Sequence, residues 1–159
     1  MTFFSKLLAL LMLLTSAQVF AAGGGGGAPD TPVKPEDPVI TSSKAAIAQQ
    51  DWLRSQQILK TALANNPNNA DYHNLYAFSI RKGPNPDMGL VFEQYQEALR
   101  IDPKHRGAHE YMGEAYLMVN NLAKAKEHLA ALDRLCFFPC EEFSDLKEAV
   151  QKYEASHKP

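Results

Sequence analysis

The sequence predicts an all-α protein built from stacked helical hairpins, and three observations lead to this fold class. Apolar residues recur at helical spacing from about Thr41 onward, and no alternating strand pattern competes with them. Pro67 and Pro103 each follow an Ala-Leu pair whose Leu lies four residues earlier. The residues around these prolines match at a shift of 36 positions, which is in the range of helical-hairpin repeats.

The composition limits the class of protein before any motif is considered. A chain of 159 residues has room for one domain, and 45% hydrophobic with 21% charged residues is ordinary for a globular protein. The formal net charge of −2 lacks the basic footprint that nucleic-acid binding requires. We therefore expect no nucleic-acid partner and no strong electrostatic docking on anionic lipid.

Residues 1–21 have the features of a secretory signal peptide. Lys6 supplies a positive charge, Leu7–Leu14 is an apolar run too short to span a bilayer, and Val19 and Ala21 occupy the positions before a cleavage site. We expect cleavage after Ala21 and a periplasmic or secreted protein with no stable membrane anchor. An uncleaved N-terminal anchor is the alternative. A lipoprotein anchor is not expected, because it would need a Cys at the cleavage site and none is present there.

Residues 22–39 are rich in Gly and Pro. The run Gly23–Gly27 favours a flexible chain, and the proline-rich part that follows favours semi-extended backbone. We interpret this segment as a disordered linker in front of a folded domain at about residues 40–156.

Start and stop residues divide this domain into seven helices in series. Asn65-Asn66-Pro67 ends the second helix, and Asn69 is a good N-cap for the third, which ends before Gly83. We expect Asn85 to cap the fourth helix, with Pro86 at its first position. The expected helices are residues 44–48, 52–64, 70–82, 90–101, 107–119, 122–135 and 142–156.

A motif present in two copies identifies the type of repeat. One copy has His73, Tyr76, Ala77 and Ile80, and the other has His109, Met112, Gly113 and Tyr116. This pattern resembles the tetratricopeptide repeat (TPR), two antiparallel helices A and B with the consensus W-x2-L-G-x2-Y, then A-x3-F-x2-A, then P. The resemblance implies a TPR solenoid with repeats at about 40–69, 70–105 and 106–137, and a C-terminal capping helix. The segment after residue 131 also resembles small exported repeat proteins of Gram-negative bacteria.

The chain departs from the family's pattern at identifiable places. The repeat is two residues longer than the family's 34, and the excess falls in the turn at residues 83–87. His73 and His109 stand where the family has Trp, and Val91 and Leu132 are large for their positions. In the family, the small residue at the position of Gly113 lets helix A approach helix B closely.

The resemblance implies that helix A of each repeat lines a concave face that binds a partner. Such a module is non-enzymatic and serves as an interaction module or assembly adaptor for another envelope or secreted protein, bound as an extended or helical peptide. The Lys/Asn clamp that some members use for C-terminal carboxylates is not reproduced. The implied partner-binding residues are Asn74, Phe78, Arg81, Lys82, Glu110, Glu114 and Leu117, with Asp71, Gly107 and Met118 beside them; simple solvated helix surface is the alternative.

Cys136 and Cys140 form a second candidate site. Their spacing across a proline-containing turn brings the Cα atoms toward disulfide distance, and an exported compartment favours oxidation. We expect a structural disulfide. A metal- or thiol-handling protein that uses both cysteines and a His is the alternative function, although C-x-x-x-C is not the redox spacing C-x-x-C.

Other candidates point less clearly to chemistry. His105 and His109 are four residues apart, a spacing that can bind metal, but capping and packing fit these positions better. The sequence contains no Gly-rich phosphate loop before a helix and no G-x-S-x-G motif, so we expect no catalysis, no cofactor and no metal. Self-association through Phe137 and Phe138 is a further hypothesis.

Overall fold

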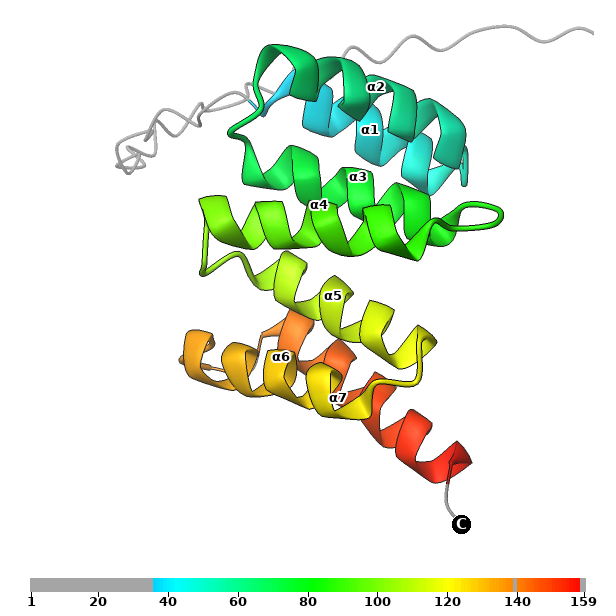
Figure 1. The fold of residues 1–159 in the computed structure, drawn as a ribbon. Helices are drawn as coiled ribbons and strands as arrows, with labels where there is room; N and C mark the ends of the chain where they lie inside the picture. The colour runs from blue at the N-terminus through cyan, green and yellow to red at the C-terminus, as the bar shows by residue number, and fades with distance from the viewer. Residues whose placement is uncertain (1–35, 139, 158–159) are drawn as a thin grey trace, which may run out of the picture. The chain divides into compact units, whose positions relative to one another are not determined.

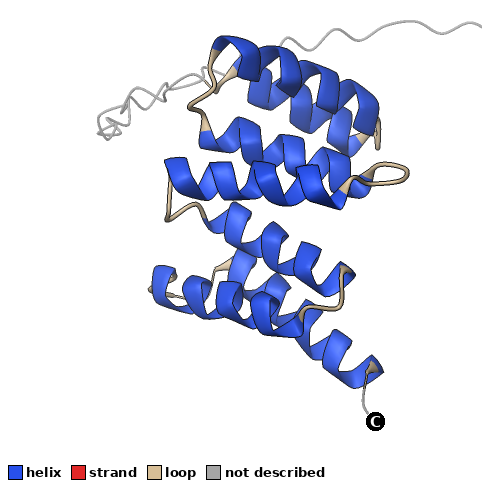
Figure 2. Ribbon diagram, viewed as in Figure 1, coloured by secondary structure: helices blue, strands red, loops and turns tan. Residues whose placement is uncertain are grey.

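The computed structural model describes residues 36–138 and 140–157, and these residues form seven helices and no strand. The all-α prediction is therefore confirmed (Figure 2). The predicted signal peptide, most of the predicted linker and Pro139 lie outside the described residues. The helices are α1 Pro38–Ala48, α2 Trp52–Asn65, α3 Ala70–Lys82, α4 Met88–Ile101, α5 Arg106–Met118, α6 Leu122–Leu135 and α7 Glu141–Ser156.

The helices pair into three hairpins that follow one another along the sequence. Helix α1 packs on α2, α3 on α4, and α5 on α6, and each hairpin contacts the next (Figure 1). The first helices of successive hairpins also touch, α1 with α3 and α3 with α5. Helix α7 packs against both α5 and α6, as expected of a capping helix.

Helix α1 begins six residues earlier than the sequence suggested, at Pro38 instead of Lys44. The Asp37 side chain accepts hydrogen bonds from the backbone N–H groups of Val39 at 2.8 Å and Ile40 at 3.4 Å. Pro38 at the first helical position loses no intrahelical bond, so both residues favour a start here. Residues 38–39, which we had placed in the linker, are therefore helical.

Caps set the starts of the next helices. Asn69 caps α3 as predicted, because its side chain accepts from the N–H of Tyr72 at 3.1 Å. The prediction that Asn85 caps α4 is wrong. Asp87 performs this role by accepting from the N–H of Leu90 at 3.1 Å, and Asn85 instead turns the chain in a left-handed conformation with φ 52°.

Two histidines explain one departure from the family's pattern. The Nε2–H of His73 donates to the carbonyl of Pro67 at 2.8 Å, and that of His109 donates to the carbonyl of Pro103 at 3.1 Å. Each ring also contacts the second helix of its own hairpin: His73 Nδ1 lies 2.7 Å from the side-chain amide of Gln94 on α4. A histidine thus fixes the preceding turn and both helices of a hairpin with two polar atoms.

Buried apolar side chains form two core clusters. The first joins α3, α4 and α5, and the second joins α6 and α7. Val91 and Leu132, which are large for their positions, are completely buried in these clusters, so the core accommodates them. The clusters consist of Ala77, Ile80, Val91, Tyr95, Met112 and Ala115, and of Ala125, Leu132, Leu146 and Val150.

Gly113 marks a close helix approach. A Cβ atom built on Gly113 would lie 2.5 Å from Cδ2 of Leu146, which is on α7. The small residue therefore lets α5 approach the capping helix. We had expected it to make room for helix B of its own repeat, but Leu146 supplies the nearest atoms, because α7 takes the place that helix A of a further repeat would occupy.

We expect Gly113→Val to lower the free energy of unfolding by about 2 kcal/mol, because the added side chain would overlap the completely buried Leu146. Denaturant unfolding measures the change. Leu146→Ala should also destabilise, and the double variant should lose less than the sum of the two single losses. Strict additivity would contradict the assigned contact.

Candidate functional site

The candidate site is the helix-A face, which we define as the surface formed by α1, α3, α5 and α7. Three aromatic rings from α2, α3 and α5 follow one another at this face, with ring centroids 6.2 Å apart for Trp52 and Phe78 and 4.6 Å apart for Phe78 and Tyr111. We call these three residues the aromatic row. Two cations lie over it: the Arg81 guanidinium is 5.5 Å and the Lys82 ammonium 5.9 Å from the Phe78 ring centroid.

Arg81 is buried, with 6% of its surface exposed, although the sequence placed it among residues that meet a partner. Its guanidinium donates to the Glu114 carboxylate at 2.6 Å and to the Tyr95 hydroxyl at 3.3 Å. The ion pair is charge-assisted and joins α3 to α5. Arg81 therefore joins the helices beneath the accessible surface of the helix-A face, and Glu114 remains partly exposed beside it.

Asn74 and Glu110 are also buried, with 5% and 7% of their surfaces exposed. The Asn74 side-chain amide of α3 packs against α5. Its Nδ2 is 3.3 Å from the position that a Cβ on Gly107 would take, so the glycine makes room for the amide. The side-chain oxygen of Asn74 has no hydrogen-bond partner in the described residues. Burial raises the pKa of Glu110 to about 8, helped by the neighbouring carboxylate of Glu114.

The remaining predicted residues are accessible. Lys82 and Met118 are exposed, and Phe78, Glu114 and Leu117 are partly exposed. The predicted set therefore divides into an accessible group and a buried group, and both lie on the same helices, α3 and α5.

Sequence reasoning missed three residues on or beside this surface: Trp52 of α2, which contacts Phe78, Tyr111 of α5, and Asp145 of α7, which acts on Glu110. Trp52 belongs to a B helix and Asp145 to the capping helix, and the repeat pattern assigns partner contacts only to helix A of each repeat. Tyr111 precedes Glu114 by three residues on α5, so helical spacing could have placed both on one face.

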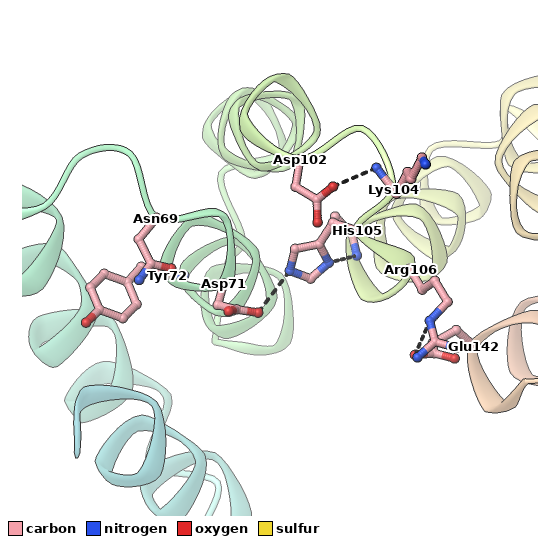
Figure 3. A network of polar contacts seen from close by, with 9 residues as sticks. Asn69, Asp71, Tyr72, Asp102, Lys104, His105, Arg106 and Glu142 are labelled. Atoms are coloured by element: carbon pink, nitrogen blue, oxygen red, sulfur yellow. Dashed lines mark hydrogen bonds and ion pairs between the residues drawn. The ribbon is translucent and has the colours of Figure 1, made fainter. Parts of the chain in front are cut away.

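Polar contacts connect the N-terminal ends of the A helices (Figure 3). The His105 Nδ1 atom accepts from the N–H of Ala108 and caps α5, so its Nε2–H donates to Asp71 of α3 at 3.1 Å. This hydrogen bond lowers the pKa of Asp71. Arg106 of α5 pairs with Glu142 of α7 at 3.5 Å. These contacts link three successive A helices at the same end.

The two histidines that sequence spacing placed together act separately. His105 caps a helix, as predicted, whereas His109 Nδ1 lies 3.0 Å from Nδ1 of His128 on α6. Burial and the nearby His109 ring together lower the pKa of His128 to about 4. Both rings line an open hollow of about 460 Å³ together with Arg134 and Glu127 of α6, at the hairpin between α5 and α6.

The two cysteines lie close together after α6. Their Cα atoms are 5.8 Å apart and their sulfur atoms are at bonding distance. Phe137 and Phe138 in the intervening turn are 93% and 76% exposed. Within residues 36–138 and 140–157, no group of three or more His, Cys, Asp or Glu side chains is placed to hold a metal ion. No helix among these residues is long and apolar enough to cross a membrane.

Comparison with known proteins identifies the fold. No family model and no curated protein sequence matches the chain. Among solved structures, the TPR2B domain of yeast Sti1, in a complex with pHsp70, superposes with a TM-score of 0.66 at 16% identity, covering 75% of this chain and 95% of that chain. The type III secretion translocator chaperone SycD of Yersinia enterocolitica gives a TM-score of 0.64 at 11% identity, covering 74% and 82%. The predicted TPR-type fold is therefore confirmed.

The buried carboxyl of Glu110 should make stability depend on pH. Its pKa of about 8 in the folded state lies above its ordinary value of 4.5, so the folded state keeps a proton that the unfolded state releases. Stability that is complete below the ordinary pKa is therefore lost as pH rises toward the folded pKa. We expect melting temperatures of the wild type to fall more steeply between pH 4.5 and about 8 than those of Glu110→Gln, which has no titrating group at this position.

Glu93→Gln is the matched control, because Glu93 is exposed on α4. It should follow the wild type at every pH. Thermal melts at constant ionic strength measure both, and parallel curves for wild type and Glu110→Gln would contradict the raised pKa.

Proposed function

We propose that the protein is a non-enzymatic interaction module that binds an extended or helical segment of another envelope or secreted protein along its helix-A face. The observation that carries this proposal is the partly exposed aromatic row with Lys82 beside it. Aromatic side chains next to fixed charges are typical of positions that dominate binding energy in interfaces.

The polar contacts behind the surface support the same proposal. Arg81 is fixed by Glu114 and Tyr95, and it holds Phe78 and Tyr111 under its guanidinium at 5.5 and 5.7 Å. A surface whose side chains are already ordered loses little conformational entropy when a ligand binds. The helix-A face is therefore suited to receive a peptide without large rearrangement.

Proteins of the same fold bind partners of this kind. SycD has been solved in complex with a peptide of the translocator YopD, and that structure superposes with a TM-score of 0.61 at 13% identity. The CopN–Scc3 complex gives a TM-score of 0.57 at 16% identity. These similarities support a protein or peptide as the ligand class for this chain.

The envelope location is part of the proposal and rests on the sequence. Residues 1–21 have the charge, apolar run and cleavage positions of a signal peptide. The proximity of Cys136 and Cys140 suits an oxidising compartment, where we propose that they form a disulfide between α6 and α7. No group of three or more metal-ligating side chains within the described residues supports the metal-handling alternative.

Charge reversal at Lys82 tests the binding face. Lys82→Glu should reduce capture of the partner from an envelope extract by about tenfold, because it replaces the cation beside the aromatic row with a negative charge. Its melting temperature should fall only slightly, since the side chain is exposed and loses one cation–π contact with Phe78. Lys60→Glu is the control. It makes the same charge change at an exposed position of α2, outside the helix-A face, and should capture normally. Equal loss in both variants would refute the assignment.

Mass spectrometry tests the export and disulfide proposals together. The purified protein should begin at Ala22 and should take up no iodoacetamide before reduction. Cys136→Ser combined with Cys140→Ser should lower the free energy of unfolding by about 2 kcal/mol, because the closed loop is short. Two alkylated cysteines in the unreduced protein would contradict a disulfide, and an uncut N-terminus would contradict signal cleavage.

A further inference from the structure

Two buried polar residues on the helix-A face, Asn74 and Glu110, are incompletely paired. The Asn74 side-chain oxygen has no hydrogen-bond partner among residues 36–138 and 140–157, and Glu110 forms no ion pair among them, although both residues are more than nine-tenths buried. The Asn74 amide occupies the space above Gly107, and Glu110 follows Gly107 by one helical turn on α5. The Asn74 amide of α3 therefore lies against α5 about one helical turn from Glu110.

Carboxylates outnumber cations around Glu110. Glu114 from α5 and Glu142 and Asp145 from α7 all act on Glu110. Arg81 on α3 is the cation that acts on Glu110, and it is already paired with Glu114 at 2.6 Å.

Glu142 is paired with Arg106, the other cation of the cluster, at 3.5 Å. Within the described part of the chain, Glu110 and Asp145 have no ion-pair partner, so two carboxylates remain without a cation. A buried polar group without a partner is energetically costly, and a cluster of like charges adds to that cost.

We propose that a lysine or arginine side chain of the bound partner inserts at Glu110, between α3 and α7, and donates to the Glu110 carboxylate and to the Asn74 side-chain oxygen. This inference rests on the proposed function, because it names the side chain that the helix-A face recognises. It makes Glu110 and Asn74 the residues that select a basic segment.

The chemistry of the acceptors favours a side-chain cation over other ligands. An ammonium or guanidinium group carries several N–H donors and one positive charge, so it can satisfy both acceptors and neutralise Glu110. A bare metal ion would need more ligands, and no group of three or more metal-ligating side chains exists within the described residues. A water molecule can donate to both groups but brings no positive charge to the surrounding carboxylates.

The raised pKa of Glu110 agrees with this assignment. In the free protein the carboxyl holds a proton because of burial and the nearby carboxylates of Glu114, Asp145 and Glu142. Arg81 lowers the pKa of Glu110 but does not offset these effects, because it is paired with Glu114. A bound cation favours the ionised carboxylate, so the proton leaves to solvent as the ligand binds.

Selection from a phage-displayed library of random linear peptides tests the inference with the full-length protein. Peptides selected by the wild type should share one position rich in Lys or Arg, and those selected by Glu93→Gln should show the same enrichment. Peptides selected by Glu110→Gln should lose that enrichment while keeping their other preferences. Gln has the shape of the protonated Glu, so this variant retains the packing of α5.

A synthetic peptide from the wild-type selection then gives the magnitude. Replacing its basic residue with Gln should weaken binding to the wild type about tenfold and to Glu110→Gln less than about twofold, since the second substitution removes the same interaction.

The outcomes separate the two proposals. Failure to select any peptide would contradict the proposed function, and the inference with it. Selected peptides without Lys or Arg enrichment, or with the same enrichment in Glu110→Gln, would overturn the inference and leave the interaction module in place.

Discussion

The hydrogen bond from a histidine to a proline carbonyl recurs at both turns between repeats, and the register of the stack depends on it. His73 reaches back to Pro67 and His109 to Pro103, and each ring also bonds to the second helix of its hairpin. In a solenoid each hairpin contacts only its neighbours, so the relation of one repeat to the next must be fixed at every turn. A histidine satisfies the turn carbonyl with one ring nitrogen and reaches the second helix of its hairpin with the other.

A second layer of polar contacts orders the surface above this stack. The Arg81–Glu114 pair ties α3 to α5, and the contacts of His105 and Arg106 connect α5 to α3 and α7. A buried ion pair adds little net stability, but it penalises arrangements in which either charge is left alone. Its effect here is to hold Phe78 and Tyr111 in one orientation, which is what a preformed binding surface requires.

The helix-A face has two chemically different ends. The aromatic row with Lys82 is apolar and cationic, whereas the strip around Glu110 is acidic and short of donors. A partner segment that fits both would carry a basic residue separated from apolar or acidic ones, which also sets the direction in which it binds. The capping helix contributes to the acidic end through Glu142 and Asp145, so α7 is part of the surface as well as a cover for the core.

The sequence by itself determined the all-α class, the three hairpins, the capping helix and caps such as Asn69 and His105, because these depend on residues a few positions apart. It also selected the helices that carry the candidate site. Only the tertiary structure decided that Arg81, Asn74 and Glu110 are buried, that Gly113 makes room for Leu146, and that His109 meets His128. Those facts depend on side chains brought together from different helices, where packing geometry determines which residue of a repeating pattern faces solvent and which faces a neighbour.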